Sequence, residues 1–276
     1  MEHIITGGNG LKLYVNEAGN QTARPLLLIH GFSQSHVSWQ ELFKDEKLLN
    51  QFRLIALDLR GHGLSEKPFG AEHYNHSQLW ADDIKAVIDA LQLQNVVLVA
   101  WSYGGLVACD YLRFYGAEAL SALVMVAAAT KMAQRSAANH YGPGVTQDMP
   151  KMTATDFNKQ YSALESFLNR CTAKPFSSEE FGRQIAINMM TPAQVRLGLI
   201  SRKLDNDDVL SQHQLPMLCI QGSEDQMVTV GSSEHSLSLN QNPKSRLSFY
   251  EGVGHMPFVE ETERFVSDLS AFIESL

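Results

Sequence analysis

The chain of 276 residues is 44% hydrophobic and 9% aromatic, which is enough to bury a large core in one domain with an insertion or in two domains. Its formal net charge of -8, without a stripe of basic residues, argues against nucleic acid as the main partner. No apolar run approaches the roughly 20 residues of a membrane span, and the first residues lack the basic and apolar regions of a signal peptide. We therefore expect no membrane partner and a cytoplasmic location, which three cysteines without a Cys-x-x-Cys pair also fit.

The first part of the chain predicts strands separated by turns. Residues 4–6 and 11–15 flank a glycine-rich stretch and predict an opening β-hairpin. The apolar run at residues 25–29 predicts a buried strand. It ends in His30-Gly31-Phe32, where the glycine lets the chain turn tightly and present the next backbone N–H.

A second apolar run, residues 54–57, predicts the next buried strand, and polar residues follow its end. We expect Asp58 and Arg60 to brace the turn there, and we interpret His62 as a packed side chain rather than a catalytic one. After this turn strands alternate with helical patterns, such as the apolar face of residues 84–91. Such alternation is typical of a mostly parallel sheet with helices on both faces.

The most informative segment is a predicted strand, a sharp turn and a helix near the middle of the chain. The apolar strand at residues 96–100 runs into Trp101-Ser102-Tyr103-Gly104-Gly105, and an amphipathic helix follows at residues 106–115. This is the pattern of a nucleophile elbow, with Ser102 at its tip. Ala100 and Gly104 are small where the strand and the helix nearly touch.

The same pattern predicts two oxyanion donors. The helix behind the nucleophile directs free N–H groups at the point where an oxyanion would form. The tight turn after residue 29 presents a second N–H over the elbow. We therefore expect the backbone N–H groups of Phe32 and Tyr103 to stabilise the oxyanion.

Between Thr130 and Leu215 the alternation stops, and no strand is predicted. One helix is indicated around residues 157–171, a second after Ser177, which forms a capping-box pattern with Glu180, and a third from Thr191-Pro192. His140 lies in a polar stretch of this segment and is interpreted as a solvated residue. We interpret residues 131–211 as a helical cap over the active site. Residues 1–130 and 212–276 form the core.

A serine nucleophile needs an imidazole to accept its proton and a carboxylate to orient that imidazole. In the elbow architecture the acid and then the histidine follow the serine, each after a later strand of the sheet. The strand predicted at residues 217–220 ends in Gly222-Ser223-Glu224-Asp225, and the strand at residues 247–250 is followed by His255. We assign Asp225 as the acid and His255 as the base. Glu224 remains the alternative acid.

Taken together, these motifs resemble the α/β-hydrolase superfamily. The resemblance covers about residues 4–130 and 212–276 and implies the α/β-hydrolase fold: an α/β architecture with a mostly parallel sheet, helices on both faces and an inserted helical cap. Within the superfamily the chain resembles small serine esterases, lactonases and cofactor-free perhydrolases or haloperoxidases. It departs from the usual pattern at Ala100, where glycine is commoner. Haloalkane dehalogenases and epoxide hydrolases carry aspartate in place of Ser102, so those two chemistries are disfavoured.

We expect a serine hydrolase that cleaves a carboxylic ester of a small, largely apolar acyl substrate through an acyl-enzyme, with no metal and no organic cofactor. The alternatives are a lactonase, a cofactor-free perhydrolase or haloperoxidase, an esterase for methyl esters of carrier-bound acyl chains, and a hydrolase-like receptor with slow turnover. The sequence leaves the oligomeric state open. Apolar residues beside the motifs are predicted to line the substrate pocket: Trp39, Trp101, Met227, Val228, Met256 and Phe258.

Overall fold

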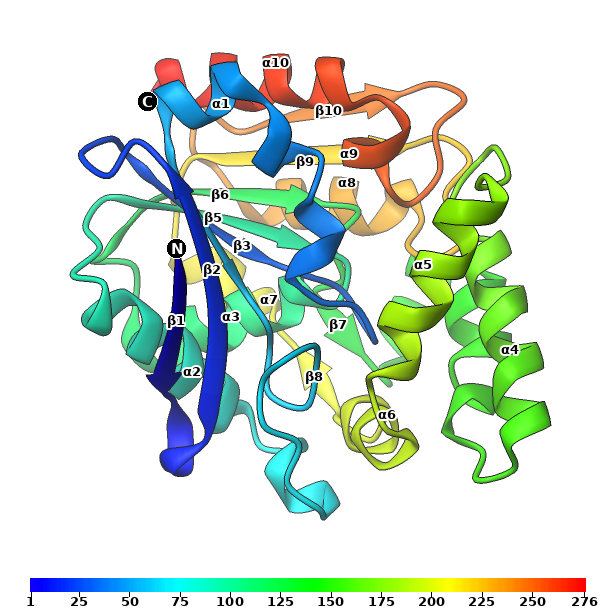
Figure 1. Ribbon diagram of the computed structural model, residues 1–276. Coiled ribbons are helices and arrows are strands. Elements are labelled where there is room, and N and C mark those ends of the chain that lie inside the picture. The colour runs from blue at the N-terminus through cyan, green and yellow to red at the C-terminus, as the bar shows by residue number, and fades with distance from the viewer.

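The computed structural model describes residues 1–276 and contains one central eight-stranded sheet (Figure 1). The strand order is β1-β2-β4-β3-β5-β6-β9-β10. β2 pairs antiparallel with both β1 and β4, and every pair from β4 to β10 is parallel. The strands of this sheet are β1 (Glu2–Thr6), β2 (Lys12–Gly19), β3 (Pro25–Ile29), β4 (Arg53–Leu57), β5 (Val96–Trp101), β6 (Leu120–Val126), β9 (Met217–Gly222) and β10 (Arg246–Tyr250).

Helices cover both faces of the sheet. Figure 1 shows α1 and α10 above it and α2, α3 and α8 below it. Every residue of β3, β5 and β9 is buried, because parallel strands between two helical layers meet water on neither face. The helices are α1 (Glu46–Gln51), α2 (Ser77–Ala90), α3 (Gly104–Tyr115), α4 (Phe157–Asn169), α5 (Ser178–Met189), α6 (Ala193–Ile200), α7 (Asp207–Gln212), α8 (Val230–Leu239), α9 (Pro257–Glu260) and α10 (Thr262–Glu274).

This architecture confirms the predicted α/β class. The opening hairpin, the buried strands and the elbow helix form where the pattern of apolar residues predicts them. Because the parallel strands share one direction, their carboxyl ends meet at one edge of the sheet, which lies at the right in Figure 1. The loops that carry the candidate catalytic residues all leave the sheet at this edge.

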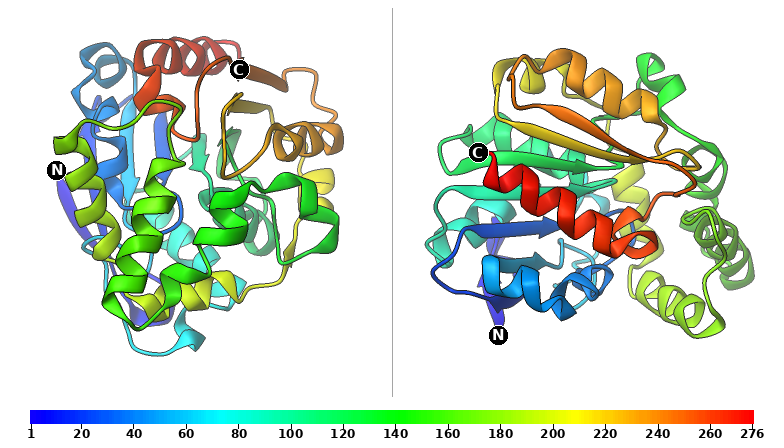
Figure 2. Two further views of the ribbon diagram at one scale, coloured as in Figure 1. Left: turned by 90° about the vertical axis from the view of Figure 1, so that its right-hand side faces the viewer. Right: turned by 90° about the horizontal axis from the view of Figure 1, so that it is seen from above.

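The segment between β6 and β9 places α4, α5 and α6 beyond that edge (Figure 1), and the left view of Figure 2 faces them. The predicted starts of these helices are confirmed. The Ser177 side chain accepts a hydrogen bond from the backbone N–H of Glu180 ahead of α5, and Pro192 stands directly before α6. The division into a core and a cap at residues 131 and 211 stays a prediction.

Two features of this segment differ from the sequence-based expectation. The segment does contain strands: β7 (Lys131–Met132) pairs antiparallel with β8 (Leu204–Asp205). Two residues are too few for a periodic pattern, and the partners are far apart in the chain, so only the tertiary structure brings them together. His140 is buried, not solvated, because its segment packs against α8, where the ring of His235 lies 5.2 Å from its own.

Candidate active site

Ser102 lies at a sharp, strained turn between β5 and α3. The strand ends at Trp101 and the helix begins at Gly104, so only two residues make the turn. Ser102 has a φ of 54°, in the left-handed region that residues other than glycine rarely adopt. A Cβ at Gly104 would lie 2.6 Å from the carbonyl oxygen of Ile29, so the close approach requires glycine. This is the local geometry of a nucleophile elbow.

His255 and Asp225 are in direct contact. The distance from His255 Nδ1 to Asp225 Oδ2 is 2.8 Å, and the two side chains are 3% and 1% exposed. Because a carboxylate only accepts hydrogen bonds, Nδ1 carries the proton and Nε2 is left as the proton acceptor. The alternative acid, Glu224, is exposed and accepts a hydrogen bond from the Ser223 hydroxyl.

The Asp225 carboxylate is held in one orientation by four donors. Besides His255, Oδ2 accepts from Gln221 Nε2 at 3.0 Å, and Oδ1 accepts from the backbone N–H groups of Met227 and Val228 at 2.7 and 3.0 Å. The sequence analysis missed Gln221, which the hydroxyl of Ser233 fixes in turn. An amide at the end of the apolar strand β9 was the signal that could have revealed it.

The residue before the candidate nucleophile also contacts the candidate base. Trp101 Nε1 donates to the backbone carbonyl oxygen of His255 at 2.9 Å, and the two rings lie 5.6 Å apart. The structure thus brings the ends of β5 and the His255 loop together. No hydrogen bond joins the hydroxyl of Ser102 to His255 here. Such catalytic hydrogen bonds are often long before substrate binds.

The N–H of Phe32 is oriented through its own peptide group. The carbonyl oxygen of Gly31 accepts from His30 Nδ1 at 2.8 Å and from the backbone N–H of Gln34 at 3.3 Å. In a planar trans peptide the N–H points opposite to the carbonyl. The N–H of Phe32 therefore points away from these donors, and it has no acceptor within the protein.

Tyr103 has the same arrangement. The carbonyl oxygen of Ser102 accepts from the N–H groups of Gly105 and Ala129 at 3.0 and 2.9 Å, which fixes the peptide that carries the Tyr103 N–H. This N–H also donates to no acceptor in the protein. Two fixed, unpaired donors beside Ser102 are what an oxyanion hole requires.

Two buried histidines support the turn that carries Phe32. The backbone N–H of Leu59 donates to His30 Nε2 at 3.1 Å, and the backbone N–H of Ser33 donates to His62 Nε2 at 3.3 Å. Burial lowers the pKa of His30 to about 4 and that of His62 to about 3, so both rings are neutral at pH 7. His62 is therefore a packed side chain, and His30 is a further residue whose contribution the sequence analysis did not assign.

The six residues predicted to line the substrate pocket are all buried. Three of them form an aromatic cluster: the Phe258 ring lies 4.5 Å from Trp39 and 5.0 Å from Trp101. Met227 and Val228 reach the site through their backbone N–H groups, which donate to Asp225. Contact of any of the six side chains with substrate stays a prediction.

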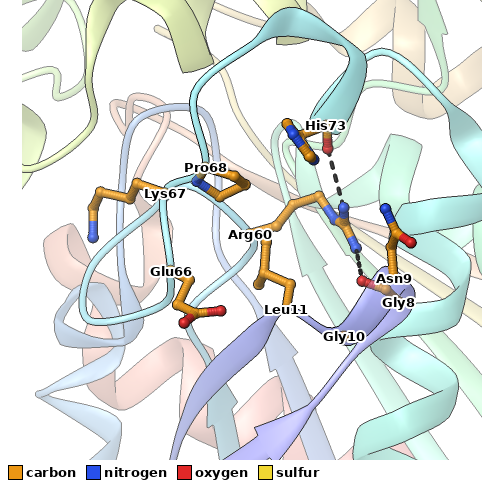
Figure 3. Close-up of a pocket in the computed structure, with 9 residues that line it drawn as sticks. All are labelled: Gly8, Asn9, Gly10, Leu11, Arg60, Glu66, Lys67, Pro68 and His73. Carbon is orange, nitrogen blue, oxygen red and sulfur yellow. Dashed lines mark hydrogen bonds between the residues drawn. The ribbon is translucent and has the colours of Figure 1, made fainter.

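A cavity of about 400 Å³ lies elsewhere, beside the turn between β1 and β2 (Figure 3). Arg60 on its wall donates to the carbonyl oxygens of Gly8 and His73 and forms a buried ion pair with Asp83 at 2.7 Å. Each of its three guanidinium nitrogens therefore forms hydrogen bonds that hold the fold. Asp58 braces the loop after β4, to which Arg60 also belongs, by accepting a hydrogen bond from the N–H of Leu64 at 2.7 Å.

The geometry and the sequence lead to one family. The model of the alpha/beta hydrolase fold family matches residues 24–262, and the chain belongs to this family. No helix of the structure combines the length and the apolar character needed to cross a bilayer.

Several relatives match the chain over nearly its whole length. The AB hydrolase superfamily protein YisY of Bacillus subtilis is 29% identical and is covered completely, as is this chain. The bifunctional esterase/perhydrolase DCH of Acinetobacter calcoaceticus is 27% identical, with 98% of this chain and 99% of DCH covered. The crystal structure of the esterase RhEst1 from Rhodococcus sp. ECU1013 is 33% identical, with a TM-score of 0.93 and coverage of 100% of this chain and 99% of RhEst1.

Proposed function

We propose that this protein is a serine hydrolase that cleaves carboxylic esters of small, largely apolar acyl groups through an acyl-enzyme intermediate. The observation that carries the proposal is the buried hydrogen bond of 2.8 Å between His255 and Asp225, joined to the strained Ser102 turn through Trp101. The esterase and perhydrolase names of whole-length relatives agree with this assignment.

In the proposed mechanism His255 Nε2 accepts the proton of Ser102 as the serine oxygen attacks the ester carbonyl carbon. The N–H groups of Phe32 and Tyr103 bind the oxyanion of the tetrahedral intermediate. His255 then protonates the leaving alcohol, and the acyl group stays on Ser102. Water repeats the same steps to release the acid and restore the serine.

The apolar character of the acyl group follows from what surrounds the donors. The Phe32 ring lies 6.1 Å from Phe167 of α4 and 6.4 Å from Tyr103, and all three side chains are buried. A chain that enters between α4 and the elbow would meet aromatic carbon rather than charge. Burial of such groups favours apolar acyl chains.

The test combines an ester panel with a probe of the nucleophile. We expect p-nitrophenyl esters to be hydrolysed and a fluorophosphonate to label the protein rapidly. Ser102→Ala should abolish labelling, and Ser102→Ala and His255→Ala should each lower kcat by about 10⁶, with the double variant hardly worse. Ser211→Ala, an exposed serine on α7, is the control and should behave as wild type. Additive losses, or labelling that persists without Ser102, would contradict the proposal.

A second candidate, a perhydrolase, uses the same site with peroxide in place of water at the second step. This second candidate is supported by the whole-length similarity of the chain to the bifunctional esterase/perhydrolase DCH. Peracid formed from acetate and hydrogen peroxide by wild type, but not by Ser102→Ala, would support it.

A further inference from the structure

Helix α6, in the segment between β6 and β9, carries a buried arginine that has no acidic partner. Arg196 is completely buried, and its guanidinium donates only to neutral oxygens: Ser33 Oγ at 2.9 Å, and the carbonyl oxygens of Met152 at 3.1 Å and Asn188 at 2.5 Å. Burial lowers the pKa of Arg196 to about 10, which leaves it charged at pH 7. Burying a cation without a carboxylate costs free energy, and an apolar side chain could fill the same space. Packing alone therefore does not account for Arg196.

Arg196 is hydrogen-bonded to Ser33, a residue of the core that directly follows a candidate oxyanion donor. Ser33 comes directly after Phe32 and has a φ of 61°. Its backbone N–H is held by His62, and its hydroxyl accepts from Arg196 and donates to the carbonyl oxygen of Asn188 at 3.3 Å. His62, in the loop after β4, thus fixes the backbone of Ser33, and Arg196, in the segment between β6 and β9, fixes its side chain.

The helix that carries Arg196 is itself anchored against the core. The hydroxyl of Tyr103 donates to the carbonyl oxygen of Leu199 in α6 at 3.3 Å. At Gly198 an added Cβ would lie 2.6 Å from the Cβ of Tyr74, so the helix sits as close as its backbone allows. With α6 held against the core by these two contacts, the guanidinium of Arg196 reaches Ser33 from a defined position. Helix α6 therefore contacts Tyr103, whose N–H is one candidate donor, and Ser33, which directly follows the other candidate donor, Phe32.

We propose that Arg196 is a positioning residue that fixes the oxyanion donor Phe32 through Ser33, so that seating of α6 on the core completes the oxyanion hole. The proposal rests on the serine-hydrolase function proposed above. None of the hydrogen bonds of Arg196 goes to the triad. Movement of α6 away from the core would free the Ser33 hydroxyl and loosen the peptide that carries the Phe32 N–H.

Three variants test this inference: Arg196→Met, Arg196→Lys and Ser33→Ala. Complete loss of one oxyanion donor costs about 10²–10³ in kcat, so we expect Arg196→Met to lower kcat by about 10- to 100-fold, with KM changed by less than about threefold. Arg196→Lys should recover part of the loss, since an ammonium can replace only some of the three contacts. Arg183→Met is the matched control, because Arg183 bonds only to Glu179 and Glu180 of its own helix.

A transition-state mimic separates positioning from general structural damage. A trifluoromethyl ketone forms a tetrahedral adduct on the serine, so its inhibition constant should rise in parallel with the loss of kcat, whereas inhibition by the leaving-group alcohol, which places no anionic oxygen in the hole, should not change. Thermal unfolding checks that each variant is folded. If Arg196→Met does not fold, Ser33→Ala, which removes a single oxygen atom, decides by the same criteria.

Folded variants that keep the kcat and the ketone affinity of wild type would overturn the inference, as would a rise in KM alone. These outcomes leave the proposed function intact, because wild type would still label and hydrolyse esters. Wild-type protein that neither labels with fluorophosphonate nor turns over any ester would refute the proposed function itself, and the inference with it.

Discussion

The indole of Trp101 donates its N–H to the backbone carbonyl oxygen of His255 across 2.9 Å, which joins the residue before the candidate nucleophile to the candidate base. The two residues come from the last position of β5 and the loop after β10, and they meet because the parallel strands end at one edge of the sheet. The buried carbonyl oxygen of His255 accepts this one hydrogen bond, so its hydrogen bonding depends on Trp101.

Trp101→Phe should therefore weaken both stability and catalysis. Phenylalanine retains an aromatic ring but leaves the His255 carbonyl oxygen without this donor, which typically costs about 1–3 kcal/mol of the free energy of unfolding. We expect urea denaturation to show this loss and ester hydrolysis to show a kcat reduced by about 10-fold. Unchanged values in both measurements would mean that the hydrogen bond holds neither the loop nor the base.

Gln221→Glu should change how activity depends on pH. The new carboxylate would stand where an amide now donates to Asp225 Oδ2 at 3.0 Å, and two carboxylates at this separation share a proton rather than both ionise. Once the pair loses its shared proton, the extra negative charge beside His255 favours the protonated ring, so the acidic limb of the kcat/KM profile should move to higher pH. Gln221→Met is the control: it removes the donor without adding charge, so kcat should fall by about 10-fold with the limb in place. A profile that is the same in all three proteins would exclude Gln221 from any influence on the candidate triad.

The two buried histidines predict a loss of stability on mild acidification. The pKa values of His30 and His62 are about 4 and about 3 in the folded protein because burial disfavours the charged ring, whereas an unfolded histidine titrates near 6.5. As pH falls below 6.5 the unfolded chain binds protons that the folded chain excludes, so the free energy of unfolding decreases, by roughly 3 kcal/mol per histidine near pH 4.

Urea titrations at pH 7.5, 6 and 5 measure this dependence before most carboxylates titrate. Replacement of one of these titrating groups should reduce the slope, so His62→Gln should be less stable at pH 7.5 but less sensitive to acid. An identical slope in wild type and His62→Gln would show that His62 does not resist protonation in the folded state.

Gly104→Ala should disrupt the elbow. The added methyl group would lie 2.6 Å from the carbonyl oxygen of Ile29, a backbone atom that cannot rotate away, so α3 must shift. We expect a loss of about 1–3 kcal/mol in stability and a fall in kcat, because the N–H of Tyr103 moves with the helix. Gly182→Ala in α5 is the matched control, since its methyl group meets nothing within 4 Å and alanine favours helix by about 1 kcal/mol. Equal stability of the two alanine variants would contradict this account of the turn.

Several elements could be predicted from the sequence because their signals are local. A strand such as β5 is a continuous apolar run, and the turn at Ser102 requires small neighbours at fixed positions, so pattern and spacing define both. The start of α5 follows from the side-chain chemistry of Ser177 alone. The pair β7 and β8 left no such signal, since each strand has two residues and its partner lies beyond the whole helical segment.

The sequence by itself determined which motifs follow the predicted strands and in what order, and it determined the candidate residues Ser102, Asp225 and His255. These signals are local, because apolar runs and small turn residues occupy neighbouring positions in the chain. Only the tertiary structure decided which side chains hold these residues in place: Gln221 on Asp225, His30 on the peptide of Phe32, and Arg196 on Ser33. Hydrogen bonds between residues distant in the chain depend on directions and distances of about 3 Å, and these are fixed only when the sheet, its helices and the segment beyond its edge are assembled.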